Sequence, residues 1–227
     1  MSNTIFLVGG GKGGVGKSLM SIALLDFLHT TGQRPFLVET DTSVPDVFKT
    51  YGKAIAGELV NLDEREGWID LVNLVDGNPE STVVINTGAR NQTGISNFGR
   101  TLSKALPELG RKLVVIWMID RKRESLELLS DFRETIPEAE VHVVRNMYLG
   151  TEKKFELYNG SKMRAAIEAV GGKSLNLPEL ADRVTDAMNK GRLTIEGALG
   201  ELSLGDRMEL ERWRDDCKAM LSEVAGG

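Results

Sequence analysis

Residues 9–18 read GGGKGGVGKS, and no other stretch says as much about the fold of this chain. From Gly11 to Ser18 the stretch satisfies the pattern G-x-x-x-x-G-K-[ST], and Lys12 adds a second lysine directly after the first glycine. Such glycines let successive backbone N–H groups point into one concavity at the positive end of the next helix, where they hold phosphates. Lys17 is expected to reach the β- and γ-phosphates, and the Ser18 hydroxyl is expected to bind Mg²⁺. The expected nucleotide-binding residues here are Gly11, Lys12, Gly13, Gly14, Val15, Gly16, Lys17, Ser18 and Leu19.

The segments on either side of this loop predict a strand–loop–helix unit. Residues 4–8 form a short apolar run that ends in glycines, which indicates a buried strand. Residues 19–28 are apolar on most faces and contain neither Gly nor Pro, so they indicate a packed helix. A glycine-rich turn with two solvated lysines is the alternative, and it is disfavoured because strand, loop and helix follow in the order that a phosphate loop requires.

Short apolar strands alternate with helical stretches along the rest of the chain. We expect strands at 35–38, 82–85, 113–119, 140–144 and 174–177, and helices at 96–109, 125–136 and 162–170, with Ser125 as an N-cap. Residues 44–76 form a mixed region, in which the apolar residues between Trp68 and Val75 indicate a helix that buries one side. This alternation predicts an α/β fold with a doubly wound, mainly parallel sheet in three α/β/α layers. A helical C-terminal tail is expected at about 180–227, with breaks at Gly191, Gly197, Gly200 and Gly205, and residues 1–227 are expected to form one domain.

Composition excludes several functional classes. The formal charge of −5 is spread along the chain, which argues against a protein that mainly coats nucleic acid. Cys217 is the only cysteine, so no intrachain disulfide or cysteine-based metal cluster can form, and a reducing compartment is expected. The first strand begins too early to leave room for a signal peptide, and no apolar run is long enough to cross a bilayer. We therefore expect a cytoplasmic protein without a membrane partner.

The segment KGGVGKS at residues 12–18 resembles the deviant Walker A motif of the ParA/MinD family of dimeric P-loop ATPases. That family includes plasmid-partition, division-site and mobilisation proteins. The resemblance implies that Lys12 reaches across a dimer interface to the phosphates of the partner's ATP, and that Lys12 and Lys17 act in catalysis. A cation in that place neutralises charge that develops during phosphoryl transfer, so ATP binding and homodimerisation would be coupled.

A second family landmark is a D-x-D pair after the second strand, which here reads Glu39-Thr40-Asp41. The resemblance implies that Asp41 orients the attacking water and lies near Mg²⁺. A carboxylate at the carboxyl end of a strand beside the phosphate loop suits that role. The alternative is a turn or helix-capping Asp.

Two further matches involve asparagines. In the Walker B-like segment 83–89, Asn86 stands where the family has Asp, so Mg²⁺ affinity or hydrolysis should be reduced, while Gly88 is expected to act as a γ-phosphate switch. Asn146 ends the strand that begins at residue 140 and matches the asparagine whose amide pairs with adenine. Asparagine is also common in turns, so both interpretations of Asn146 stay open.

By resemblance, the chain is expected to be a slow, Mg²⁺-dependent dimeric ATPase switch in plasmid or mobile-element partition or conjugative transfer, stimulated by a protein partner. One alternative is a nucleotide-dependent scaffold that hydrolyses little ATP, and another is an ATP-dependent metabolic ligase. Nonspecific DNA contact is a further hypothesis. It rests on two basic stretches, Arg121-Lys122-Arg123 and the group Lys153, Lys154, Lys162 and Arg164 with Phe155 and Tyr158 among them.

Overall fold

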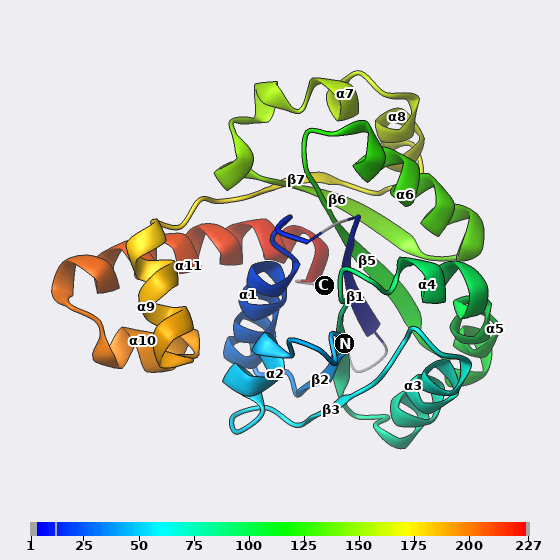
Figure 1. Cartoon of the computed structure of the whole chain (residues 1–227), viewed down its shortest axis with the longest axis horizontal. Coiled ribbons are helices and arrows are strands. Elements are labelled where there is room, and N and C mark those ends of the chain that lie inside the picture. Colours follow the sequence, from blue (N-terminus) through cyan, green and yellow to red (C-terminus); the bar gives the residue numbers. More distant parts are fainter. Residues whose placement is uncertain (1–3, 12, 226–227) are drawn as a thin grey trace.

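The computed structural model describes residues 4–11 and 13–225, and in them seven parallel strands form one sheet in the order β3-β2-β4-β1-β5-β6-β7 (Figure 1). The strands are β1 (Thr4–Gly10), β2 (Pro35–Glu39), β3 (Gly57–Leu59), β4 (Thr82–Asn86), β5 (Lys112–Ile119), β6 (Glu140–Asn146) and β7 (Ser174–Leu177). The connections from β1 lead to β2 on one side of it, and the chain later reaches β5 on the other side. The order in which the chain adds strands therefore reverses at β1, and ligands of such sheets bind at the carboxyl ends of the strands near that point.

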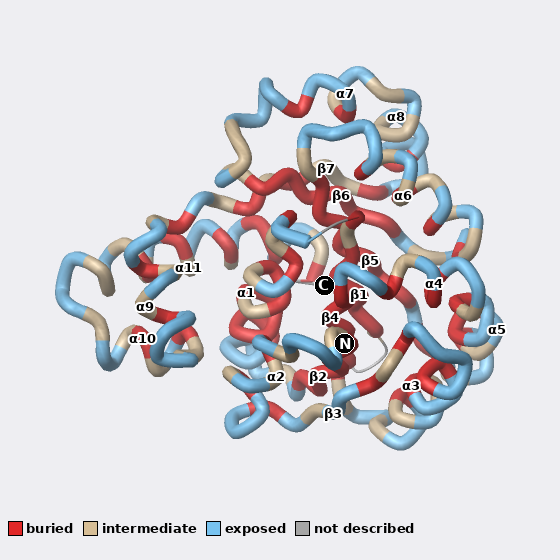
Figure 2. The backbone as a smooth tube through the Cα atoms, viewed as in Figure 1, coloured by how far each residue is buried: buried red, intermediate tan, exposed pale blue. Residues whose placement is uncertain are grey.

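Helices cover both faces of the sheet, as Figure 1 shows. They are α1 (Lys17–Thr30), α2 (Asp46–Tyr51), α3 (Arg65–Gly77), α4 (Gln92–Phe98), α5 (Arg100–Leu109), α6 (Arg123–Thr135), α7 (Glu156–Asn159), α8 (Lys162–Glu168), α9 (Asp182–Gly191), α10 (Ile195–Glu201) and α11 (Leu204–Ala225), with the 3₁₀ turns η1 (Met147–Leu149) and η2 (Glu152–Lys154). Alternate residues of β1 explain the layers. Phe6 and Val8 pack with α1, α2 and α11, whereas Ile5 and Leu7 pack with α3, α5 and α6. The three-layer prediction is confirmed, and Figure 2 shows the buried residues concentrated in the sheet between the helices.

Some local predictions are confirmed and others are corrected. In the mixed region 44–76, the helix indicated by Trp68 to Val75 is α3, and the region also contains α2 and the edge strand β3, which were not predicted. Strand β3 escaped prediction because Glu58 and Leu59 are both exposed, so it has no apolar pattern. The helix expected over 96–109 is two helices, which meet at Gly99, where a Cβ would lie 2.5 Å from the Ile95 carbonyl oxygen. Ser125 does not cap α6, because its buried hydroxyl donates to Oδ1 of Asp120 at 2.7 Å.

The C-terminal tail is helical as expected, but its breaks are placed differently. Gly191 ends α9, whereas Gly197 and Gly200 lie inside α10 and Gly205 lies inside α11. The second break falls at residues 202–203. Tertiary packing overrides the low helix propensity of these glycines, since α11 packs along α1 and buries Trp213 completely. In the part of the chain that the structure describes, no helix is long and apolar enough to span a bilayer.

Candidate functional site

A cavity of about 650 Å³ lies at the carboxyl end of the sheet, over the phosphate loop. Its walls come from the phosphate loop and α1, the loops after β2 and β4, α2, and the tail helix α9. The volume is in the range of small-molecule sites, and the position is where a sheet of this topology binds ligands. Lys17, Ser18, Leu19 and Asp41, all predicted from the sequence, line this one cavity.

The phosphate loop has the backbone that its glycines make possible. Gly14 and Gly16 have φ values of 80° and 101°, in the left-handed region that other residues avoid. A Cβ on Gly16 would also lie 2.6 Å from Nδ2 of Asn146, so a larger residue is excluded there for a second reason. Helix α1 starts directly after Gly16, and its first turn carries no acidic residue that would offset the positive end of the helix. The loop therefore offers a place for anions.

Lys17 is buried at the start of α1, with 7% of its surface exposed. Burial lowers the pKa of Lys17 to about 8, although the nearby charge of Asp41 works in the opposite direction. The ammonium group is therefore charged at neutral pH but close to losing its proton. An arriving phosphate would stabilise the charged form and raise this pKa.

Asp41 follows β2 and faces the same cavity. Its Oδ1 accepts hydrogen bonds from the Ser43 hydroxyl at 2.7 Å and from the Val44 N–H at 3.0 Å. Burial alone would raise the pKa of Asp41, but these hydrogen bonds and the charge of Arg90 outweigh it and hold the pKa below its ordinary value. Asp41 is thus an ionised acceptor, suited to orienting a water molecule or a hydrated cation and ill suited to removing a proton.

Glu39 and Asn86 form a buried pair that sequence reasoning missed. The β2–β4 register places them side by side, and Nδ2 of Asn86 donates to Oε1 of Glu39 at 2.9 Å. The amide oxygen of Asn86 accepts from the Ser21 hydroxyl of α1 at 2.8 Å. Burial raises the pKa of Glu39, which is fully buried, although hydrogen bonds from Asp41 and Asn86 oppose the rise. The acid that the family places on β4 is absent at position 86, but a carboxylate stands beside it on β2.

Gly88, the predicted switch residue, is held by its neighbours. Its N–H donates to Oδ1 of Asn91 at 2.6 Å and to the Thr40 hydroxyl at 3.1 Å. Nδ2 of Asn91 donates to Asp63, so the loop is tied to the turn that precedes α3. A switch at Gly88 would require this N–H to leave Asn91, and the role of Gly88 stays a prediction.

Asn146 is hydrogen-bonded to the backbone of the phosphate loop. Its Nδ2 donates to the carbonyl oxygen of Val15 at 3.1 Å, and its Oδ1 accepts from the N–H of Tyr148 at 3.1 Å. Since Asn146 is 5% exposed, its contact with adenine stays a prediction, while its contact with the loop is a fact of the fold.

Lys12, expected to reach a partner's ATP, lies outside the described residues. Of the described residues predicted to bind nucleotide, Gly11, Val15 and Asn146 are not among those that line this cavity. Arg121 and Lys122 line a second cavity of about 450 Å³ with Lys154, and Gly13 and Gly14 line both cavities. Phe155 and Tyr158 are buried in the core rather than exposed among the basic residues, so they do not form a surface with them.

Helix α9 and the turn after it contribute residues that sequence reasoning did not select: Thr185, Asn189 and Arg192 line the cavity. Nothing in the local sequence signals this placement, because it depends on how the tail folds back.

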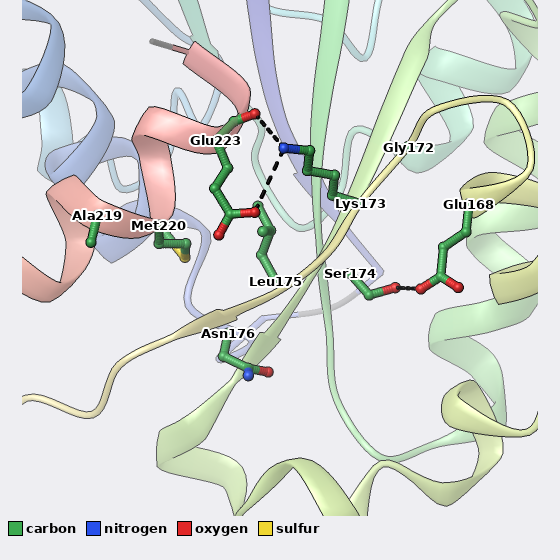
Figure 3. Close-up of a pocket in the computed structure, with 9 residues that line it drawn as sticks. All are labelled: Glu168, Gly172, Lys173, Ser174, Leu175, Asn176, Ala219, Met220 and Glu223. Atoms are coloured by element: carbon green, nitrogen blue, oxygen red, sulfur yellow. Dashed lines mark hydrogen bonds and ion pairs between the residues drawn. The ribbon is translucent and has the colours of Figure 1, made fainter.

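A cavity of about 570 Å³ between β7 and α11 is a weaker candidate. Figure 3 shows that Lys173 binds Glu223 and that Ser174 binds Glu168, so these four side chains already engage one another. The cavity over the phosphate loop is the candidate site.

Comparisons with known proteins show which proteins this chain resembles. Residues 6–158 match the model of the family described as the CobQ/CobB/MinD/ParA nucleotide binding domain. Protein MobD of Acidithiobacillus ferrooxidans is 54% identical over 224 residues, with 99% of each chain covered. A protein TraL of Escherichia coli is 27% identical over 219 residues, with 88% of each chain covered.

Solved structures show the same fold at low sequence identity. The MinD cell division protein of Aquifex aeolicus has a TM-score of 0.55 at 12% identity, covering 96% of this chain and 97% of that chain. A nucleotide-binding protein of Archaeoglobus fulgidus in complex with ADP has a TM-score of 0.51 at 13% identity, with coverages of 84% and 87%.

Proposed function

Since the chain belongs to the CobQ/CobB/MinD/ParA family of nucleotide-binding domains, we propose that it binds ATP and Mg²⁺ in the cavity over the phosphate loop and hydrolyses the ATP slowly. One observation carries the proposal. Lys17, Ser18 and Asp41 line a single cavity of about 650 Å³ at the start of α1, although Asp41 comes from the loop after β2. Gly13, Gly14 and Gly16 of the loop line the same cavity, as a phosphate chain requires.

The residues present fit a hydrated Mg²⁺ ion. Ser18 is exposed to the cavity, and Asp41 is an ionised carboxylate there, so both offer the hard oxygen atoms that Mg²⁺ prefers. When bound, the ion would neutralise charge on the phosphates. Asp41 would orient the attacking water through a hydrogen bond, while Lys17 and the loop N–H groups would stabilise charge that develops on the phosphates.

The dimeric part of the proposal depends on Lys12. In the family that the motif resembles, this lysine contacts the partner's nucleotide, so ATP would favour a homodimer and hydrolysis would reset it. The likeness to proteins named MobD and TraL supports a role in mobilisation or conjugative transfer, inside the cytoplasm and with a protein partner that stimulates hydrolysis.

Sedimentation with ATP, with ADP and without nucleotide, each with and without nonspecific DNA, tests this proposal. We expect a dimer with ATP only, and its loss in both Lys12→Ala and Lys17→Ala. An oligomeric state that ignores ATP would overturn the switch, and absence of ATP binding to the wild type would overturn the site. A DNA-dependent shift in the ATP state alone would support the DNA hypothesis.

A second candidate, a scaffold with little hydrolysis, is favoured by the Glu39–Asn86 pair, because the neutral amide stands on β4. A metabolic ligase has less support, and full turnover in Lys12→Ala would favour it.

The double variant Glu39→Gln/Asn86→Asp, which exchanges the acid and the amide, distinguishes the scaffold from the ATPase switch. A large gain in ATP turnover would support the scaffold, and unchanged turnover would support the ATPase switch.

A further inference from the structure

The turn after α9 has an unusual backbone at a charged residue. Among residues 4–11 and 13–225, Arg192 is the one residue other than glycine with a positive φ, with φ and ψ both 48°. This left-handed conformation at the end of a helix favours glycine or asparagine, yet Gly191 stands one position too early to take it. Strained residues of this kind persist where the surrounding fold holds them, and they cluster at functional sites.

The surrounding fold does hold this turn. The N–H of Leu193 donates to the carbonyl oxygen of Met188 at 2.9 Å, which closes the end of the helix. The N–H of Ile195 donates to the Tyr51 hydroxyl at 3.2 Å, which ties the turn to α2. Arg192 is therefore placed by contacts on both sides of it, and its own side chain contributes none of them.

Helix α9 presents one polar stripe to the cavity. Thr185 and Asn189 lie one turn apart on the helix, Arg192 directly follows its last residue, and all three line the cavity over the phosphate loop. Val184 and Met188, at the neighbouring positions, are buried in the core. The helix is thus fixed by its apolar side, and its polar side ends in an arginine that faces the same space as Lys17.

Charge and chemistry indicate what this arginine binds. The cavity wall carries the carboxylates of Asp41 and Asp46 as well as the ammonium group of Lys17, so the positive charge of Lys17 does not exceed the negative charge of these two residues. Arg192 is exposed, and no ion pair with another described residue engages its guanidinium group. A guanidinium offers several N–H donors in a rigid fork that matches phosphate oxygens.

We propose that Arg192 binds the phosphates of the nucleotide within the same chain, so that α9 closes the site from the C-terminal tail. This inference rests on the proposed nucleotide site. It adds a binding residue outside residues 6–158, the segment that matches the family model.

Arg192→Gly tests the proposal because the two effects of the substitution have opposite signs. Glycine relieves the left-handed backbone, so the thermal midpoint without nucleotide should stay equal or rise. Loss of the guanidinium should weaken binding of a non-hydrolysable ATP analogue with Mg²⁺ about tenfold. Arg192→Asn, also suited to this backbone, should behave the same way. Lys190→Ala removes one exposed charge from the same helix and should bind within about twofold of the wild type.

Calorimetric titration of the four proteins gives the answer. If Arg192→Gly and Arg192→Asn bind as tightly as Lys190→Ala, the role of Arg192 is wrong while the nucleotide site stands. If the wild type itself binds no nucleotide, the proposed function fails and this inference fails with it.

Discussion

Asn86 of β4 donates a hydrogen bond of 2.9 Å from Nδ2 to Oε1 of Glu39 on the adjacent strand β2. The pair is buried, and Glu39 Oε2 has no hydrogen-bond partner among the described residues. One acid and one amide therefore share a place where two acids would repel each other. This pairing explains why an amide at position 86 suits this chain, and it changes how that position should be tested.

Asn86→Asp by itself is expected to lower the free energy of unfolding by about 1–3 kcal/mol, because it places a second carboxylate against buried Glu39. Glu39→Gln in the same chain should recover most of the loss, since one acid and one amide are restored. Urea unfolding of the two single variants and the double variant measures the coupling. Additive losses would mean that the two side chains do not interact.

The affinity for ATP should fall as the pH rises through about 8. Burial lowers the pKa of Lys17 to about 8, and phosphate binds the charged form, so above that pH binding must first restore a proton. Calorimetry at several pH values on either side of pH 8 measures the change. Lys17→Met should bind weakly and without this pH dependence. An affinity that stays constant across this range would contradict the prediction.

The same pKa has a consequence for the protein without nucleotide. A lysine pKa lowered in the folded state costs stability below about pH 8, and the cost disappears as the pH rises toward the ordinary value of 10.5. Lys17→Met should therefore have a free energy of unfolding about 1–3 kcal/mol higher than the wild type at pH 7, measured by urea unfolding. Excess nucleotide should reverse the order, because only the wild type binds it tightly.

Asn146→Ala decides between the two interpretations of that residue. If Asn146 only supports the phosphate loop through Val15, ATP and GTP affinities should fall by the same factor. If its amide also pairs with adenine, the preference for ATP over GTP should shrink as well. Titration with both nucleotides measures the difference, with Asn159→Ala as a control on a more exposed asparagine.

The tail is held to α1 by a buried ion pair. Nε and Nη2 of Arg214 each bind a carboxylate oxygen of Asp26 at 2.8 Å, and the side chains are 14% and 8% exposed. Arg214→Ala leaves Asp26 buried and unpaired, so it should cost about 3 kcal/mol of unfolding free energy. Arg164→Ala, which breaks the exposed pair with Glu168, should cost about 1 kcal/mol or less. Equal losses would show that burial does not distinguish these pairs.

A large part of the fold could be predicted from local patterns in the sequence. The glycines of residues 9–18, the apolar strands and the helix after Ser18 were all predicted, because steric limits on φ and the alternation of side chains act between near neighbours. The same reasoning selected Lys17, Ser18 and Asp41, which line one cavity. It failed at β3, whose residues carry no apolar alternation, and at the glycines of the tail, whose helices are held by packing.

The sequence by itself determined that a strand, a phosphate loop and a helix follow one another, because the residues of that unit are contiguous. Only the tertiary structure decided that the side chain of Glu39 lies against that of Asn86, since that contact depends on the register of β2 against β4. It alone placed Arg192 in the wall of the cavity over the phosphate loop, because α9 reaches the cavity through the packing of α9 and α11 on the core. Contacts between distant segments arise from the burial of apolar surface by the whole chain, and no short stretch of sequence records them.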